Sequence, residues 1–334
     1  MVLVFSDGNS QPSSTDVLVG LFPIAARMSH EMLRVRTATL WRHTHSPLGT
    51  PLVRKGHERT ALIGLLDWLD KERRLGLLLS IELAGGDGPF FEALQALAGE
   101  QKRRLFCYNE FSRGVFRPLA DEEMYFKTVL SPKRRRNLRQ EYDKLGKIGR
   151  LETLELKPGD DLEYWLKSFI ALEASGWKGK LGTAIACSPI DMRFFDELSR
   201  CGFERGQLQM LMLRLDDRPI AMQYNLRSRR AVFALKIAYD EEFKRYSPGM
   251  LLGVEAFRLF HGRPDVDWVD SCPNAPVNIA REDLWNDSRL IRHVLVGTGN
   301  MMGQLLLRCL PTVRSLQRAL RSLRKQGFNP APRQ

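Results

Sequence analysis

Several features that mark other classes of protein are scarce or missing in this sequence. No uncharged hydrophobic run approaches the ~18 residues that a membrane-spanning helix requires, and residues 1–16 lack the basic stretch and apolar run of a secretory signal. The five cysteines are scattered, with no CxxC pair and no histidine at ligand spacing. We therefore expect a cytoplasmic protein with reduced thiols and no metal site.

Common catalytic and nucleotide-binding motifs are also missing. The chain has no GxSxG serine elbow, no Walker A lysine, no HExxH and no HxxxxD box. The stretch GTGNMMG at residues 297–303 resembles a dinucleotide loop, but the Rossmann pattern needs a further strand and an acidic residue ~20 positions later. No acidic residue follows position 287, so we interpret these glycines as ordinary turn residues.

Acidic residues are unevenly distributed along the chain, so the net charge of +12 is concentrated in two segments. Residues 288–334 contain nine basic residues and no acid, and residues 133–150 contain eight basic and two acidic residues. The rest of the chain is slightly acidic, so a nucleic-acid partner is not indicated. We expect a solvated basic helix from Lys133 and an amphipathic tail helix at 312–325. The tail helix either contacts anionic lipid or packs on its own domain.

The sequence does have the composition of a folded, mixed α/β protein. Its 334 residues are 43% hydrophobic and 27% charged, and this length favours two domains of ~150 residues each. In the first half, hydrophobic periodicity predicts strands at 18–27, 36–42, 75–84 and 105–116 and helices at 58–71 and 89–100. The expected divisions are a disordered N-terminus (1–16), an N-terminal half (17–120), a C-terminal domain (121–310) and a basic amphipathic tail (311–334).

In the second half, three helices are predicted to begin at a Ser-Pro pair: Ser131, Ser188 and Ser247. A serine hydroxyl at the N-cap accepts a hydrogen bond from an unpaired backbone N–H. Proline fits the next position because its missing N–H would have had no partner there. These pairs therefore predict the first residue of each helix.

Strands expected at 207–215, 220–227 and 231–239 form an antiparallel meander. The helix from Ser247 and a strand at 266–271 follow, and that connection requires a parallel crossover. Three antiparallel strands that lead into one parallel crossover are the strand order of a GNAT acyltransferase.

The segment at 236–252 carries the strongest functional signal. A helix N-terminus presents free N–H groups and partial positive charge, which suit a diphosphate. Gly249 permits close approach to the backbone, while Lys244 and Arg245 add charge just before the helix. The alternative is a well-capped core helix. The position after the meander, with a parallel strand following, favours the diphosphate of coenzyme A.

Five stretches between residues 125 and 287 resemble the GNAT-type acetyltransferase domain of the CelD, or BioF2-like, group of cellulose biosynthesis, which is related to Fem-type transferases. They are SPKRRRNLR (131–139), LEASGWKGKLGTA (172–184), KIAYD (236–240), YSPG (246–249) and DSC (270–272). The resemblance implies an acyl-CoA donor and a smaller or degenerate GNAT-like half before this domain. The residues expected to bind coenzyme A are Ile237, Ala238, Lys244, Arg245, Tyr246, Ser247, Gly249, Met250 and Leu251.

Two residues are candidates for the chemistry. A thioester is already activated, so the enzyme has to position the acceptor, take up its proton and stabilise the oxyanion. Asp270, at the end of the last strand, is either the base or an acceptor contact, or simply starts a turn. Tyr239 either protonates the leaving thiolate or packs at a strand end.

A second set of residues is expected to bind the acceptor. Glu173 and Trp177 share a helix face, and Lys178 follows them. The alternative places Trp177 in the core and Glu173 in solvent. Gln223 and Lys236 lie on sheet positions from which they reach either the ligand or ordinary surface neighbours.

The sequence thus predicts an enzyme that transfers an acyl group, most simply acetyl, from coenzyme A to an amine or hydroxyl. The resemblance implies a sugar, an exopolysaccharide precursor or another envelope-related acceptor. Two alternatives stay open: a Fem-type transferase that uses aminoacyl-tRNA, and a non-catalytic GNAT scaffold at the membrane surface.

Overall fold

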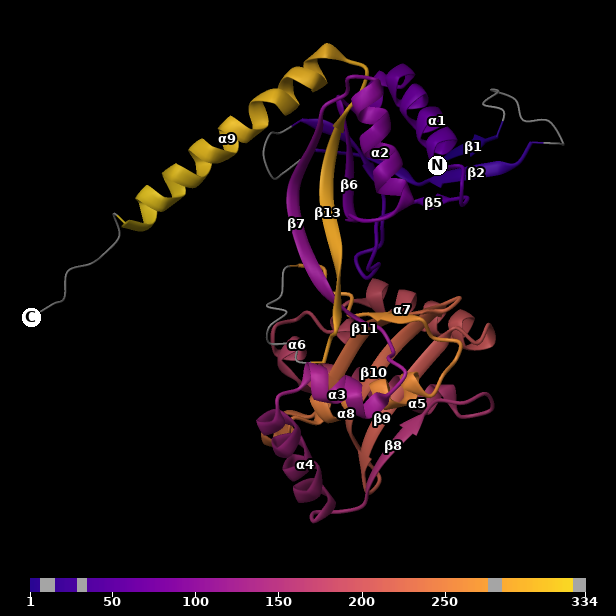
Figure 1. Ribbon diagram of the computed structural model, residues 1–334, viewed down its shortest axis with the longest axis vertical. Helices are drawn as coiled ribbons and strands as arrows, with labels where there is room; N and C mark the ends of the chain where they lie inside the picture. The colour runs from indigo at the N-terminus through magenta and orange to yellow at the C-terminus, as the bar shows by residue number, and fades with distance from the viewer. Residues whose placement is uncertain (7–15, 29–34, 276–283, 327–334) are drawn as a thin grey trace, which may run out of the picture. The chain divides into compact units, whose positions relative to one another are not determined.

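The computed structural model describes residues 1–6, 16–28, 35–275 and 284–326, apart from the side chains of Arg73, Arg314 and residues 316–326. The chain forms two compact units, Met1–Phe111 with Leu290–Gln334 and Ser112–Arg289. Both units mix helices and strands, as the sequence predicts (Figure 1). Strands β7 (Leu105–Phe116) and β13 (Asp287–Gly297) each contribute residues to both units.

The first unit contains a small antiparallel sheet and a larger mixed one. The small sheet has the order β1-β2-β5, with β1 at Val2–Phe5, β2 at Leu18–Phe22 and β5 at Leu52–Val53. The larger sheet has the order β3-β4-β6-β13-β7, with β3 at Ile24–Met28, β4 at Arg36–Leu40 and β6 at Leu78–Gly85. Of its pairs, β4 and β6 run parallel, while β6 and β13 run antiparallel.

Two helices with one apolar face each supply the core of this unit. Helices α1 (Glu58–Lys71) and α2 (Pro89–Glu100) occupy the predicted residues. Leu62, Leu65, Leu66 and Leu69 recur at helical spacing and are all buried, together with Phe91 of α2. A 3-10 turn at Arg73–Leu75 leads from α1 into β6.

The second unit is built on a sheet of strand order β7-β12-β11-β10-β9-β8. The antiparallel pairs β8–β9, β9–β10 and β10–β11 join β8 (Leu151–Glu155), β9 (Leu208–Leu215), β10 (Arg218–Ser228) and β11 (Ala231–Tyr239). Strand β12 (Trp268–Asp270) runs parallel to β11, which confirms the predicted crossover.

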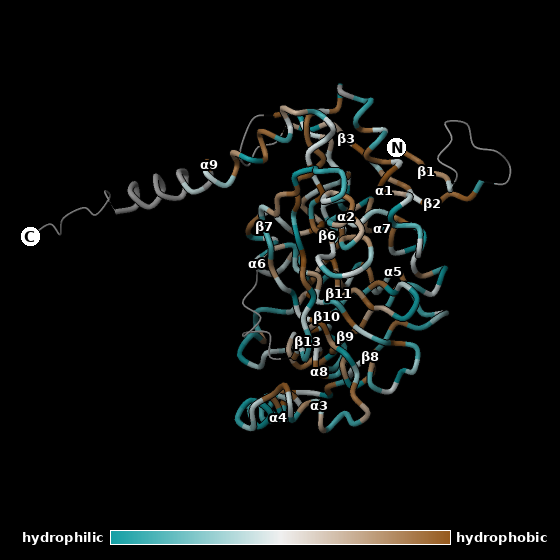
Figure 2. The backbone as a smooth tube through the Cα atoms, turned by 45° about the horizontal axis from the view of Figure 1, so that its top comes forward, coloured by the Kyte–Doolittle hydropathy of each residue, from teal (hydrophilic) through white to brown (hydrophobic). Residues whose placement is uncertain are grey.

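Helices cover both faces of this sheet. One face packs on α3 (Glu122–Val129), α4 (Pro132–Gly146) and α8 (Pro248–His261), and the other packs on α5 (Leu162–Ser175) and α7 (Pro189–Glu204). Leu211 and Leu213 point to the first face, whereas Met210 and Met212 point to the second. Both faces are buried, so the strands read as nearly continuous hydrophobic runs (Figure 2).

Short helices complete the second unit. They are α6 (Trp177–Lys180), a 3-10 turn at Ile185–Cys187 and a longer 3-10 segment, η3, at Glu241–Tyr246. η3 runs directly into α8, so that its last cap residue, Ser247, is also the N-cap of α8.

The structure corrects two expectations at the N-terminus. Residues 1–16 are not uniformly disordered, because Val2–Phe5 forms β1 with Val2 and Val4 buried; residues 7–15 lie outside the described residues. The strand expected at 18–27 is two strands, β2 and β3, that join different sheets. Pro23 lies between them, where its missing N–H cannot continue a ladder.

The predicted domain boundary near the C-terminus also differs from the structure. Residues 290–297 belong to the first unit because β13 pairs with β6 in register from Ile291 with Gly85 to Gly297 with Leu78. The tail helix begins earlier than expected: α9 spans Met301–Gln326 and contains Pro311. Its first turns are hydrophobic (Figure 2), and Leu307 and Leu310 pack on Leu78. Among the described residues, no helix is both long and apolar enough to cross a bilayer.

Candidate functional site

Strands β11 and β12 separate partway along their length. They pair only from Ala231 with Trp268 to Phe233 with Asp270, where β12 ends, while β11 continues to Tyr239. Beyond Phe233, β10 is the only strand among the described residues with which β11 pairs. We call the other side of this part of β11, residues 234–239, its free edge.

The free edge exposes backbone groups in a regular pattern. The N–H of Asp240 donates to the carbonyl oxygen of Ile220 on β10 at 2.9 Å. Since backbone groups alternate sides along a strand, the N–H and C=O groups of Ile237 and Tyr239 point to the free edge. The Nζ of Lys178 indeed donates to the Ile237 carbonyl oxygen at 3.3 Å.

A β-bulge lies at the start of the free edge. Lys236 is opposite Tyr224 on β10, and Ala234 is opposite Asn225, so Leu235 has no opposite residue. A bulge bends a strand and increases its local twist. The bend therefore coincides with the point at which β11 leaves β12.

The N-terminus of α8 lies against the end of β11. A Cβ atom placed on Gly249 would be 3.4 Å from Cδ1 of Ile237 and 3.5 Å from Cδ1 of Tyr239. The N–H groups of Ser247, Met250 and Leu251 already bond to backbone oxygens, whereas that of Gly249 has no partner among the described residues. One amide, rather than several, is thus available to an anion.

Ser247 does not cap α8 as predicted. Its side chain accepts no capping hydrogen bond, and its backbone is left-handed, with φ 49° and ψ 48°. Ser131 and Ser188, by contrast, accept from the N–H groups of Arg134 and Asp191 at 3.2 Å each. Ser247 differs because it must also end η3, and a left-handed residue reverses the chain between two helical segments.

The basic residues before α8 face α4. Arg245 stacks over the Tyr246 ring, with its guanidinium carbon 4.7 Å from the ring centroid. Both residues line a cavity of about 410 Å³ with Asn137, Gln140, Glu141 and Lys144 of α4. Lys244 is exposed, while Met250 and Leu251, in the first turn of α8, pack on the core of this unit. The predicted coenzyme A residues differ in exposure: Ile237, Lys244 and Arg245 are exposed, Tyr246, Ser247, Gly249 and Met250 are partly buried, and Ala238 and Leu251 are buried.

Glu173, Lys178 and Lys236 form one cluster on the α5 face of the sheet. The two lysine Nζ atoms lie 3.2 Å and 3.1 Å from the same carboxylate oxygen of Glu173, Oε1. The other oxygen, Oε2, accepts the N–H of Ile185 at 2.9 Å. This contradicts the alternative of a solvated Glu173 and a core Trp177, because Glu173 is buried and Trp177 is 51% exposed.

Charges within the cluster shift its pKa values. Burial alone would raise the pKa of Glu173, but the Ile185 N–H and the two ammonium groups bring it below its ordinary value. Burial also lowers the pKa of Lys178, which Glu173 partly offsets and Lys236 reinforces. Lys178 also lines a small cavity with Gly176, Trp177 and the β11 residues Ile237, Ala238 and Tyr239.

The predicted base, Asp270, is enclosed by its own ion pairs. Its Oδ1 lies 2.6 Å from Nε of Arg113, and both side chains are 0% exposed. Oδ2 accepts from Arg113 at 2.7 Å and from Arg289 at 3.4 Å, and the N–H of Cys272 donates to Oδ1 at 2.9 Å. Burial raises the pKa of the adjoining Cys272 thiol. This geometry argues against Asp270 as a base, because its oxygens are already engaged.

Gln223 does not join the cluster around Lys236. It is opposite Ile237 on the α8 face, and its Oε1 is buried without a hydrogen-bond partner among the described residues. Asn225, which sequence reasoning missed, has a similarly unpaired Oδ1. Arg113 was missed too, since it lies 157 residues from Asp270 and no local pattern connects them.

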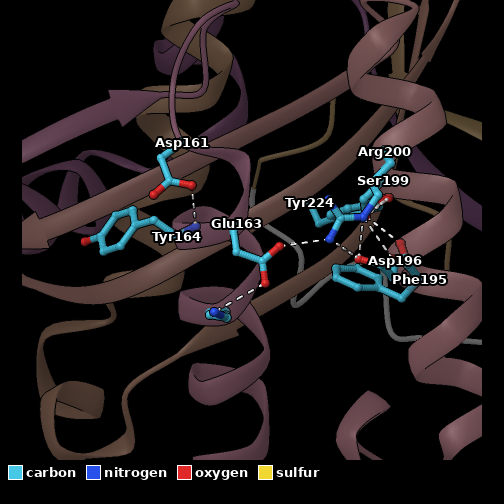
Figure 3. A network of polar contacts seen from close by, with 9 residues as sticks. Asp161, Glu163, Tyr164, Phe195, Asp196, Ser199, Arg200 and Tyr224 are labelled. Carbon is cyan, nitrogen blue, oxygen red and sulfur yellow. Dashed lines mark hydrogen bonds and ion pairs between the residues drawn. The ribbon is translucent and has the colours of Figure 1, made fainter.

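Polar contacts between α5, α7 and β10 hold the α5 face in place (Figure 3). Arg200 of α7 donates to Glu163 of α5 at 2.9 Å and also pairs with Asp196. Deeper in the unit, the hydroxyl groups of Ser199 and Tyr224 are 3.1 Å apart. Tyr224 lies on β10 opposite Lys236 of β11, so these contacts hold the strand that pairs with the lysine-bearing strand.

The split sheet and the helix end beside the free edge agree with the GNAT strand order that the sequence predicts. Comparison with protein families agrees: residues 132–275 match the model of the acetyltransferase (GNAT) domain. Residues 132–275 are therefore a GNAT-type domain, and this match supports the predicted class of enzyme. Among curated proteins, none matches the chain.

Solved structures show the same fold at low sequence identity. FemX is 11% identical, with a TM-score of 0.54 and coverage of 89% of both chains. L-PGS from Bacillus licheniformis is 11% identical, with a TM-score of 0.52 and coverage of 86% of this chain and 89% of that one. The C-terminal domain of a putative lysylphosphatidylglycerol synthetase from Agrobacterium fabrum is 11% identical, with a TM-score of 0.51 and coverage of 87% and 88%.

Proposed function

We propose that this protein transfers an acyl group, most simply acetyl, directly from coenzyme A to an amine or hydroxyl of an acceptor. The observation that carries the proposal is the free edge of β11 beside the unpaired N–H of Gly249. A strand edge offers N–H and C=O groups to an extended amide-containing arm, and a helix N-terminus offers its N–H to a diphosphate.

The reaction needs little from the protein beyond position and polarity. The acceptor nucleophile attacks the thioester carbon, the carbon–sulfur bond breaks, and the acceptor proton is finally taken up by the thiolate or solvent. N–H groups aimed at the carbonyl oxygen stabilise the charge that develops there. Since Asp270 is bound by two arginines, Tyr239 on the free edge is the candidate to protonate the thiolate.

The resemblance to the CelD or BioF2-like group supports a sugar, an exopolysaccharide precursor or another envelope-related acceptor. Within that group, enzyme and acceptor would meet in the cytoplasm. The basic α9 would bring the protein to the inner face of an anionic membrane, where each cation contributes ~1 kcal/mol. Sedimentation with vesicles rich in phosphatidylglycerol tests this contact, and equal sedimentation with phosphatidylcholine vesicles would contradict it.

Isothermal titration with acetyl-CoA tests the proposed donor. We expect the wild type to bind and Gly249→Asp to bind at least ~100-fold more weakly, because the new carboxylate would face the diphosphate. Gly146→Asp is the matched control, since Gly146 lies in the same unit with nothing within 4 Å of its Cβ position. If the wild type does not bind acetyl-CoA, coenzyme A is not the donor. If Gly249→Asp binds acetyl-CoA as well as the wild type does, the diphosphate does not lie at Gly249.

A second candidate is a Fem-type transferase that takes its acyl group from aminoacyl-tRNA. Two observations favour it: the fold neighbours include FemX and a protein named for lysylphosphatidylglycerol synthesis, and α4 is strongly basic. None of Lys133, Arg136 and Arg139 forms an ion pair with another described residue. This candidate predicts that acyl transfer requires charged tRNA and that the affinity for RNA falls steeply with salt. Replacing these three basic residues by alanine should weaken the binding of RNA.

A further inference from the structure

The cluster of Glu173, Lys178 and Lys236 carries more positive than negative charge. Two ammonium groups share one carboxylate oxygen, and the other oxygen is taken by a neutral backbone N–H. Two acidic residues follow the end of β11, and both are already paired: Asp240 with Arg218, and Glu241 with Lys180 at 2.7 Å. One positive charge of the cluster is therefore not matched by an acidic side chain among the described residues.

The unmatched charge faces the opening rather than the core. The side chain of Glu173 is 1% exposed, whereas those of Lys178 and Lys236 are 23% and 17% exposed. Lys178 uses two of its three donors, on Glu173 and on the Ile237 carbonyl, and Lys236 uses one. The remaining N–H donors have no acceptor among the described residues. Partly buried donors of this kind are costly unless water or a ligand accepts from them.

A small cavity reaches the cluster next to the free edge of β11. Its volume is about 20 Å³, which admits one water-sized group, such as a single oxygen of a carboxylate or phosphate. Trp177 lines the same cavity, and its ring lies 5.9 Å from the Nζ of Lys178. An exposed indole beside ammonium groups suits a ligand that carries an anionic group on an apolar or sugar-like body.

The cluster is distinct from the proposed diphosphate site. Lys236 is opposite Tyr224, whose ring packs on the α5 and α7 face, while Gly249 contacts the Ile237 and Tyr239 side chains from the α8 face. The two sites therefore approach the end of β11 from opposite sides of the sheet. An anion at the lysines would lie on the side from which the acceptor reaches the free edge.

We infer that Lys178 and Lys236, held together by Glu173, bind an anionic group, a carboxylate or a phosphate, of the acyl acceptor. This inference rests on the proposed acyl transfer, because it assigns the α5 side of the free edge to the acceptor. Glu173 positions the two lysines, and the lysines supply the charge. The site selects acceptors that carry an anionic group over neutral ones of the same shape.

Titration with inorganic phosphate at constant ionic strength tests binding without any assumption about the donor. We expect the wild type to bind phosphate saturably and Lys178→Met and Lys236→Met to bind it ~10-fold more weakly, with partial recovery in Lys236→Arg. Lys180→Met is the matched control, because Lys180 lies on the same short helix but pairs with Glu241. Circular dichroism melting of each variant separates lost binding from lost folding.

Several outcomes would overturn the inference. The first is that the wild type shows no saturable phosphate binding. The second is that Lys178→Met and Lys236→Met bind phosphate as well as the wild type does. The third is that only Gly249→Asp loses phosphate binding, which would place the anion at α8.

Acetyl-CoA titration of the same variants distinguishes this inference from the proposed donor. We expect the coenzyme affinity of Lys236→Met to stay within about twofold of wild type, because Lys236 lies on the face of the sheet opposite Gly249. If the wild type binds phosphate at the lysines but does not bind acetyl-CoA, the proposed donor is wrong while the anion site stands.

Acceptor pairs distinguish the chemical source of the anion. Glucosamine 6-phosphate against glucosamine tests a phosphate, and glycine against glycinamide tests a carboxylate, with release of coenzyme A as the readout. The anionic member should have a KM at least ~10-fold lower in the wild type for one of the pairs, and the two members should be equal in Lys236→Met. Equal KM values within both pairs for the wild type would contradict an anion subsite.

Discussion

Two buried carboxylates of the second unit, Asp270 and Glu173, were both predicted to act in the site, Asp270 in catalysis and Glu173 in acceptor binding, but they have different surroundings. Each accepts from two cationic side chains and one backbone N–H. Arg113, the main partner of Asp270, is 0% exposed, whereas both lysine partners of Glu173 are partly exposed and Lys178 lines a cavity. The first arrangement is closed and stabilises the fold, while the second leaves donors available to a ligand.

The largest expected effect tests the closed site. Asp270→Asn should lower the free energy of unfolding by ~3–5 kcal/mol, because it leaves the buried Arg113 guanidinium without its carboxylate. Urea unfolding followed by circular dichroism measures the loss. The double variant Arg113→Met with Asp270→Leu should recover much of it, since no unpaired charge then remains between these positions. A loss below ~1 kcal/mol in Asp270→Asn would mean that the site is not closed, and would return Asp270 to the list of candidate bases.

The open site should show a smaller and pH-dependent effect. Glu173→Gln should cost ~1–3 kcal/mol at pH 7, because the two lysines lose their shared acceptor but keep contact with water. The pKa of Glu173 is lowered in the folded protein from its ordinary value of 4.5. The unfolded chain therefore binds the proton more readily, and the stability that Glu173 contributes is present above pH ~4.5 and lost as the pH falls further.

Urea midpoints of the wild type and Glu173→Gln at pH 7, 5, 4 and 3.5 measure this difference. It should be constant at the two higher values and shrink at the two lower ones. A difference that does not change with pH would show that Glu173 stabilises the fold by packing rather than by charge.

The smallest effect is expected at Lys236. Lys236→Met should leave the free energy of unfolding within ~0.5 kcal/mol of the wild type, because Lys178 and Ile185 still satisfy Glu173. Arg113→Met should cost several times more. A large loss in Lys236→Met would contradict the idea that its charge serves a ligand.

The helix starts show how far local sequence signals reach. Ser131, Ser188 and Ser247 precede proline in the same way, and each helix begins at that proline. Only Ser131 and Ser188 cap with their side chains. The sequence alone predicted where α8 starts but not its cap, because the conformation of Ser247 depends on η3, which ends at the same residue.

In the candidate site, too, contacts between residues that are close in the sequence were predictable, and contacts between distant residues were not. The residues of β11 and of the α8 N-terminus were predictable, because the meander, the helix start and Gly249 are contiguous in the sequence. Glu173 and Lys178 were predictable as neighbours on one helix end. The pairing of Lys236 with them was not, since it depends on which face of β11 the bulge at Leu235 presents to α5.

The sequence by itself determined the mixed α/β fold of this protein, the antiparallel meander with its parallel crossover and the position of the helix starts at Ser-Pro pairs. These follow from periodicity, capping residues and chain connectivity, which act over a few residues at a time. Only the tertiary structure decided that Asp270 is closed off by Arg113 and that two lysines converge on Glu173. Charge pairing and burial join residues that lie far apart in the chain, so the same residue type can serve stability in one place and binding in another.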